Sequence, residues 1–120
     1  MNYFGMINKT ILEIQVDFLK KSSEDITLLT GYKSDYLKEY INLLNLNEIY
    51  SKPTGTVDAI KNALITLKEH ERVLFIYGDI YPDIDLNDFI NSDTNKEIHL
   101  CIHKSKHPED SDLINFKNNE

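Results

Sequence analysis

The sequence predicts a single α/β domain built on a mostly parallel sheet. Short, nearly continuous apolar runs alternate with longer segments in which apolar residues recur at helical spacing. A strand that is apolar on both faces needs cover on both faces, which is typical of parallel sheets between helices. A length of 120 residues with 41% hydrophobic and 28% charged residues suits one core. We expect residues 1–120 to form this domain, with a frayed polar tail at 111–120.

The first expected element is a helix over residues 11–21, for which a strand is the alternative. Four residues alternate as they would in a strand: Leu12, Ile14, Val16 and Phe18. The set Ile11, Ile14 and Phe18 also lies on one helical face. The segment's length and the cations Lys20 and Lys21 at its end favour the helix, because cations stabilise a helix C-terminus.

Four apolar runs predict strands, at residues 26–30, 48–50, 73–77 and 98–103. The run Val73-Leu74-Phe75-Ile76-Tyr77 is the most apolar, so we expect it to be the buried central strand. The run 98–103 alternates apolar with semi-polar residues, which indicates a strand near an edge of the sheet. The run 48–50 is short and predicts only a weak strand.

Helices are expected between these strands. Ser34 can cap a helix that extends to Leu44, and Thr56 can cap another that extends to Leu67. Asp85 is expected to open a shorter helix. Alternation of helices and strands in this order favours parallel pairing through right-handed crossovers.

Composition excludes several classes of function. The net charge is −7 and Arg72 is the sole arginine, which argues against a nucleic-acid partner. Cys101 is the sole cysteine, so an intrachain disulfide and a thiolate metal site are excluded. The apolar runs are too short to cross a membrane, and the first residues do not resemble a signal peptide. We therefore expect a cytoplasmic protein with no membrane partner.

Glycines at the expected turns are the first candidates for a binding site. Gly31, Gly55 and Gly78 each follow an apolar run or precede a helix, at the edge where open α/β sheets bind ligands. Glycine there permits a positive φ or a close approach of backbone to a ligand, although simple turn formation is the alternative. Gly55 and Thr56 precede a helix N-terminus, whose N–H groups suit an anion, and ordinary capping by Thr56 is compatible with that role.

Asp79 is the strongest single candidate. It follows the most apolar run directly, where a carboxylate can hold Mg²⁺ against a nucleotide phosphate. The alternative is a turn aspartate that bonds its own backbone. Weaker candidates are a D-x-D pattern, in which Asp85 is better explained as a helix cap, and the pair His99 and His103, which a strand would hold ~13 Å apart.

Four segments in order resemble the sugar-phosphate nucleotidyltransferases, a family that includes uridylyl-, cytidylyl- and thymidylyltransferases. These segments are Lys9–Glu13, Asp25–Lys33, Thr54–Ile60 and Leu74–Ile80. The resemblance implies a three-layer Rossmann-like sheet, a truncated nucleotide-diphospho-sugar transferase (GT-A-like) fold. In this family Mg²⁺ assists a sugar phosphate that attacks the α-phosphate of a nucleoside triphosphate, with release of pyrophosphate.

The resemblance also implies site residues. Gly55 and Thr56 match the glycine-led turn that contacts the nucleotide base, and Asp79 matches the aspartate that helps to bind the cation. Gly31 and Tyr32 match a structural turn. The expected ligands are a nucleoside triphosphate or a nucleotide-sugar, with Mg²⁺ as cofactor.

The sequence departs from the family at its start. The family's first strand, glycine-rich phosphate loop and Pro-Lys pair have no match, and residues 5–9 lie where the family enters its first helix. No residue is therefore assigned a catalytic role, and whether the chain is an enzyme stays open. The alternative is a non-catalytic remnant or interaction module that forms a homo-oligomer through an exposed sheet edge. A third hypothesis is that a separate segment supplies the loop.

Overall fold

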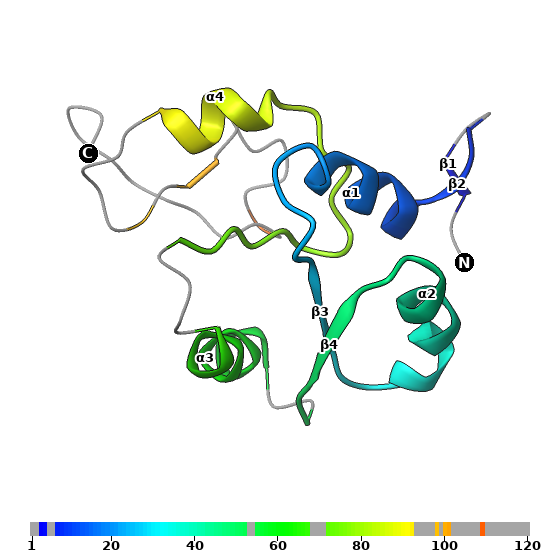
Figure 1. The fold of residues 1–120 in the computed structure, drawn as a ribbon. Coiled ribbons are helices and arrows are strands. Elements are labelled where there is room, and N and C mark those ends of the chain that lie inside the picture. The colour runs from blue at the N-terminus through cyan, green and yellow to red at the C-terminus, as the bar shows by residue number, and fades with distance from the viewer. Residues whose placement is uncertain are drawn as a thin grey trace.

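The computed structural model describes residues 3–4, 7–52, 55–67, 72–92, 98, 100–101 and 109 of a small mixed α/β fold (Figure 1). The expected frayed tail at 111–120, His99 and His103 lie outside these residues. The described elements follow in chain order: β1 Tyr3–Phe4, β2 Ile7–Thr10, α1 Ile11–Leu19, β3 Thr27–Thr30, the 3-10 helix η1 Ser34–Leu37, α2 Lys38–Leu43, β4 Asn47–Tyr50, α3 Thr56–Thr66 and α4 Leu86–Asn91.

A parallel pair of strands, β3 and β4, lies at the centre of the described structure. The register runs from Thr27 opposite Asn47 to Thr30 opposite Tyr50, and the Ser51 N–H extends it by donating to the Thr30 carbonyl at 2.9 Å. The connection between the strands contains η1 and α2. In Figure 1, α2 and α3 lie on either side of this pair. The predictions of strands at 26–30 and 48–50 and of parallel pairing are confirmed here.

Helix α1 begins with a capping box. The Thr10 hydroxyl accepts the Glu13 N–H at 3.2 Å, and the Glu13 carboxylate accepts the Thr10 N–H at 2.6 Å. Each bond satisfies a backbone N–H that the first helical turn leaves without an intrahelical partner. The segment that was ambiguous between strand and helix is therefore a helix, and it buries Gln15 and Val16.

The hydrophobic core lies between α1, the α2 region and the β3–β4 pair. Val16, Ile41 and Leu46 form its buried centre. Five partly buried residues pack against this centre: Leu12, Ile26, Leu28, Leu37 and Leu44. Because these residues come from segments before and after β3 in the sequence, the core links α1 to the parallel unit, that is, to β3, β4 and the helical connection between them.

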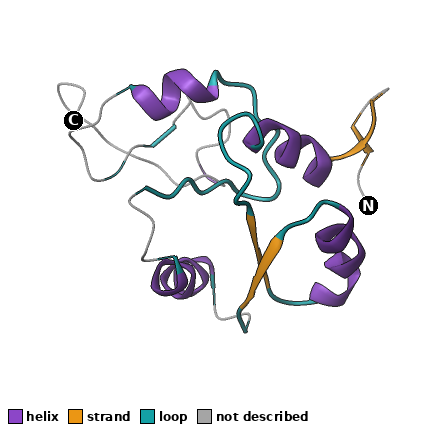
Figure 2. Ribbon diagram, viewed as in Figure 1, coloured by secondary structure: helices purple, strands orange, loops and turns teal. Residues whose placement is uncertain are grey.

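The prediction of a buried central strand at 73–77 is wrong. The whole segment is loop, as Figure 2 shows between α3 and α4, and Val73, Leu74 and Phe75 expose 37%, 40% and 41% of their surface. The physical reason is that apolar side chains favour burial but do not determine which strand pairs with the segment. Among the described residues, β3 and β4 pair with each other, and no backbone hydrogen bond joins either strand to residues 72–76.

Other expectations also need correction. The described residues of the run 98–103, which are 98, 100 and 101, form no strand, and Ile98 and Leu100 are exposed. An antiparallel pairing of β1 with β2 was not expected. No helix within the described ranges combines the length and apolarity that crossing a lipid bilayer requires.

The expected helix caps are partly confirmed. Asp85 caps α4 as predicted, and its carboxylate accepts the Asp88 N–H at 3.0 Å. Ser34 and Thr56 are the first helical residues of η1 and α3 rather than their N-caps. Gly55 is the N-cap of α3, so the helix begins at Thr56, one residue earlier than predicted. A threonine would adopt the backbone conformation of Gly55 only with strain.

Replacing Thr10 with alanine tests the capping box. Thr10→Ala removes the acceptor of the Glu13 N–H, and we expect the free energy of unfolding to fall by about 1 kcal/mol. Ser22→Ala, at an exposed position after the same helix, is the control and should change it by no more than about 0.5 kcal/mol. Equal stability of the two variants in urea denaturation would show that the box contributes nothing.

Candidate functional site

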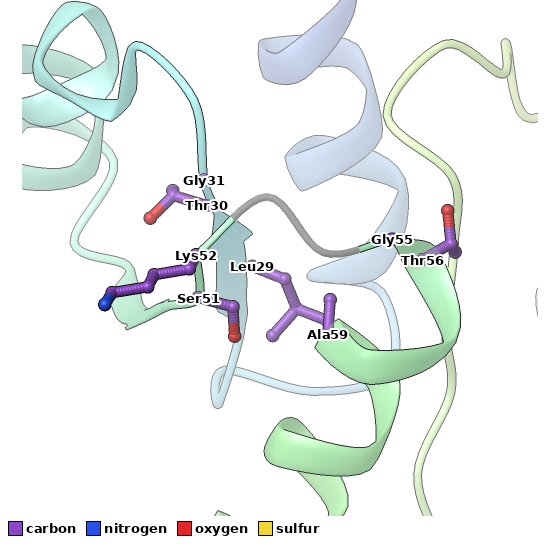
Figure 3. Close-up of a pocket in the computed structure, with 8 residues that line it drawn as sticks. All are labelled: Leu29, Thr30, Gly31, Ser51, Lys52, Gly55, Thr56 and Ala59. Atoms are coloured by element: carbon purple, nitrogen blue, oxygen red, sulfur yellow. The ribbon is translucent and has the colours of Figure 1, made fainter.

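A pocket of about 460 Å³ lies where β3 and β4 end and α3 begins (Figure 3). Parallel strands that run side by side end at the same edge of their sheet, and this is the edge at which open α/β sheets bind ligands. Eight residues line the pocket: Leu29, Thr30, Gly31, Ser51, Lys52, Gly55, Thr56 and Ala59.

Two glycines shape the rim of the pocket. A Cβ atom on Gly31 would lie 3.2 Å from the Ser51 carbonyl oxygen, so the backbones at the ends of β3 and β4 approach more closely there than most side chains permit. Gly55 has a φ of +125°, which L-residues rarely adopt, and it leads directly into α3. Gly55 therefore has the positive φ that was one of the two expected reasons for glycine at these turns. A Cβ atom on Gly31 would require the Ser51 carbonyl to shift by a few tenths of an ångström, a close approach to backbone rather than to a ligand.

The interior of the pocket is mainly apolar, and its buried hydroxyls are already bonded. Leu29 and Ala59 approach each other across the space between β3 and α3, with Ser51 beside them (Figure 3). The Ser51 hydroxyl accepts a hydrogen bond from the Asn62 amide of α3 at 3.2 Å. The Thr30 hydroxyl donates to the Glu48 carboxylate at 2.6 Å. These bonds fix the two strand ends and α3 to one another.

The start of α3 offers backbone donors at the rim. Its N-cap Gly55 provides no side-chain cap, so the N–H groups of the first turn are not satisfied by a capping side chain. An anion or a polar base edge suits such a helix start because the N–H groups and the positive end of the helix dipole point toward it. Lys52 contributes an exposed ammonium to the rim, and its side chain extends away from α3 (Figure 3).

The structure brings together two of the three predicted site residues. Gly55 and Thr56 line the pocket, whereas Asp79 is not among its lining residues. Asp79 lies exposed in a turn in which the Ile80 N–H donates to the Tyr77 carbonyl at 3.2 Å. Its expected place directly after a central strand is not observed, because residues 73–77 form no strand.

Sequence reasoning missed most of the pocket's lining, including Leu29, Ser51 and Ala59. A signal was present in the parallel pairing itself. Once residues 26–30 and 48–50 are paired in parallel, their following residues Gly31 and Ser51 must meet at one edge.

Gln15 was also missed, although it joins α1 to the turn that contains Asp79. Its amide nitrogen donates to the Tyr77 carbonyl at 2.9 Å and to the Ile80 carbonyl at 2.6 Å. The residue is only 4% exposed, so these bonds lie in an environment where an unpaired carbonyl is costly. A glutamine between Ile14 and Val16 on a helix gives no hint of such a distant partner.

The residues of the pocket do not by themselves fit Mg²⁺. This ion prefers carboxylates and phosphate oxygens, and none of the eight lining residues has a carboxylate. Throughout the described part of the chain, no group of three His, Cys, Asp or Glu side chains gathers around a common point. The D-x-D pattern places Asp85 at the cap of α4, as its alternative explanation required.

Two surface ion pairs carry the electrostatic shifts in the described residues. The hydrogen bond from Lys38 lowers the pKa of Asp35, and the same bond raises the pKa of Lys38. The hydrogen bond to Asp17 raises the pKa of Lys9. None of these residues lines the pocket, so the pairs supply no acid or base to it.

Alanine substitutions at two glycines test the backbone geometry of the rim. Gly55→Ala forces an L-residue into a conformation that is essentially restricted to glycine, and we expect it to destabilise the fold by about 1–3 kcal/mol. Gly78→Ala is the matched control, because its φ lies outside that region and its Cβ would meet nothing within 4 Å. A thermal midpoint that is unchanged in Gly55→Ala would contradict the observed φ.

Removing the Gln15 amide tests the link between α1 and the turn. Gln15→Leu leaves the Ile80 carbonyl without its amide donor and removes one of two donors to Tyr77, so we expect a loss of about 1–3 kcal/mol. Asp17→Asn on the same helix should cost less, because its ion pair with Lys9 is exposed to solvent. Equal losses in guanidinium denaturation would argue against a structural role for Gln15.

Comparisons with known proteins identify no relative of this chain. The sequence matches no family model and no curated protein, and the structure matches no solved structure.

Proposed function

We propose that this chain is a nucleotidyltransferase-like domain that binds a nucleoside triphosphate or a nucleotide-sugar in the pocket at the ends of β3 and β4. The observation that carries the proposal is that Gly55 and Thr56, which the sequence motifs assign to the nucleotide, line this pocket. Ligands of open α/β sheets bind beyond the carboxyl ends of the strands, where this pocket lies.

The pocket supports this class of ligand in size and polarity. Its volume of about 460 Å³ falls within the roughly 300–1,000 Å³ that is common for small-molecule sites. The apolar side chains of Leu29 and Ala59 suit a flat base, and the N–H groups at the start of α3 suit a polar base edge or a phosphate. Lys52 adds positive charge at the rim of a chain whose net charge is −7.

The proposal includes a finer description of the fold. It assigns β3, the helical connection and β4 to a Rossmann-like unit of a three-layer, GT-A-like sheet. The parallel register of β3 with β4 and the positions of α2 and α3 on either side of the pair support this assignment. The cytoplasm, where nucleoside triphosphates are available, is the compartment that the proposal implies.

The expected magnesium ligand, Asp79, does not line the pocket, so the proposal places no Mg²⁺ there. When bound, Mg²⁺ would neutralise phosphate charge. The pocket's lining offers no carboxylate, so no chemical step is derived through the cation. The nucleotide alone is assigned to the pocket. The described residues of the chain bind and orient the ligand in this proposal, and none is assigned as a catalytic group.

Filling the pocket tests the proposal. A nucleoside triphosphate at millimolar concentration should raise the thermal midpoint of the native chain by several degrees, because a ligand that binds only the folded state stabilises it. Ala59→Leu places a larger side chain in the pocket and should abolish the shift. Val57→Leu, at an exposed position of α3 that does not line the pocket, should retain it. No shift with any nucleotide, or the same shift in both variants, would refute binding at this site.

A second candidate function is a non-catalytic interaction module. The exposed apolar segment Val73–Tyr77 favours it, because such a segment is available to another chain. Release of pyrophosphate from a nucleoside triphosphate and a sugar phosphate would exclude this candidate.

A further inference from the structure

The segment Arg72–Asp79 has the composition of a β-strand but lies outside any sheet. Five apolar residues, Val73–Tyr77, stand between Arg72 at one end and Gly78 and Asp79 at the other. β-branched and aromatic residues of this kind are enriched in strands. A short window with high β-propensity, no internal charge and no proline is also the composition that pairs most readily with other strands.

The segment is held at both ends and open in the middle. The Arg72 guanidinium donates to the Ile90 carbonyl at 2.7 Å, and the Tyr77 carbonyl accepts from Gln15 at 2.9 Å. Between these anchors, residues 73–76 make no backbone hydrogen bond to the backbone of any described residue. An anchored segment loses less conformational entropy when it pairs than a free one does.

We propose that residues 73–77 form an antiparallel strand pair with the same residues of a second copy of the chain, with Arg72 and Asp79 flanking the pair. The observation that selects this partner is the charge at the two ends. Antiparallel pairing brings Arg72 of one copy to the end where Asp79 of the partner subunit lies, and it does so at both ends of the pair. Parallel pairing of two copies would instead bring like charges together.

The pairing accounts for the exposed side chains of this segment. Val73, Leu74 and Phe75 each leave more than a third of their surface in solvent, and strand pairing covers part of it. The pairing also supplies partners to backbone groups that have no backbone partner among the described residues. A few paired residues make a small interface, and the charge of −7 on each copy opposes association. We therefore expect a weak dimer, with a dissociation constant on the order of 100 μM.

This inference does not depend on nucleotide binding. None of the residues 72–79 lines the pocket at the ends of β3 and β4, so the dimer and the binding of a nucleotide are measured separately. A chain that dimerises without binding any nucleotide would leave the inference intact and refute only the proposed function.

Sedimentation velocity from roughly 10 μM to 1 mM tests the pairing. The native chain should shift from the mass of one copy toward that of two as concentration rises. Phe75→Glu places a charge in the middle of the paired segment and should remain monomeric throughout. The control Ile65→Glu, on the exposed face of α3, should dimerise like the native chain. Both sites are exposed, so circular dichroism should show native helix content in both variants.

Charge reversal tests the antiparallel direction. Arg72→Asp and Asp79→Arg should each weaken the dimer about tenfold, because each places like charges at both ends of the pair. The double variant restores opposite charges and should dimerise nearly as well as the native chain. A native chain that stays monomeric at 1 mM, a Phe75→Glu variant that dimerises or unfolds, or a double variant no better than the single ones would overturn the inference.

Discussion

The parallel pairing of β3 with β4 is the constraint on which the candidate site depends. It brings Gly31 and Ser51 to the same edge, although they are separated by a helical connection in the sequence. The close approach of Gly31 to the Ser51 carbonyl oxygen, with 3.2 Å left for a Cβ atom, leaves room for nothing larger than glycine without a shift of the strand ends. The hydrogen bond from Asn62 to Ser51 then holds α3 against this edge, so the pocket follows from the pairing.

The described structure is less evenly stabilised than its composition suggests. Val16, Ile41 and Leu46 form one buried cluster around α1 and the parallel unit, whereas the segment before α4 exposes most of its apolar side chains. The Gln15 amide is one of the contacts that join these regions, through the carbonyls of Tyr77 and Ile80. A region with few buried apolar contacts opens at a lower free-energy cost than the core, so the turn with Asp79 is expected to exchange its amide protons faster than β3.

Sequence patterns predicted those features that local chemistry determines. The cap at Asp85, the strands at 26–30 and 48–50 and the helix after Thr10 each follow from residues that are near one another in the chain. The run Val73–Tyr77 failed as a strand because its apolarity could not specify which backbone would pair with it.

Only part of the candidate site could be predicted from the sequence, for the same reason. Gly55 could be selected because glycine, unlike other residues, adopts a positive φ without a steric clash of its own side chain. Leu29 and Ala59 could not, because they meet only once the register of the strands and the position of α3 are known. Asp79 was selected from its position after an expected strand. Because residues 73–77 form no strand, Asp79 lies in an exposed turn instead.

Amide chemical shifts of the ¹⁵N-labelled chain, followed during titration with a nucleoside triphosphate, test the central claim most directly. Binding at the strand ends should move the resonances of Gly31, Ser51, Gly55 and Thr56 in a saturable way, with little change in the exposed part of α2. Shifts confined to residues away from β3, β4 and the start of α3, or no shifts at millimolar nucleotide, would contradict it.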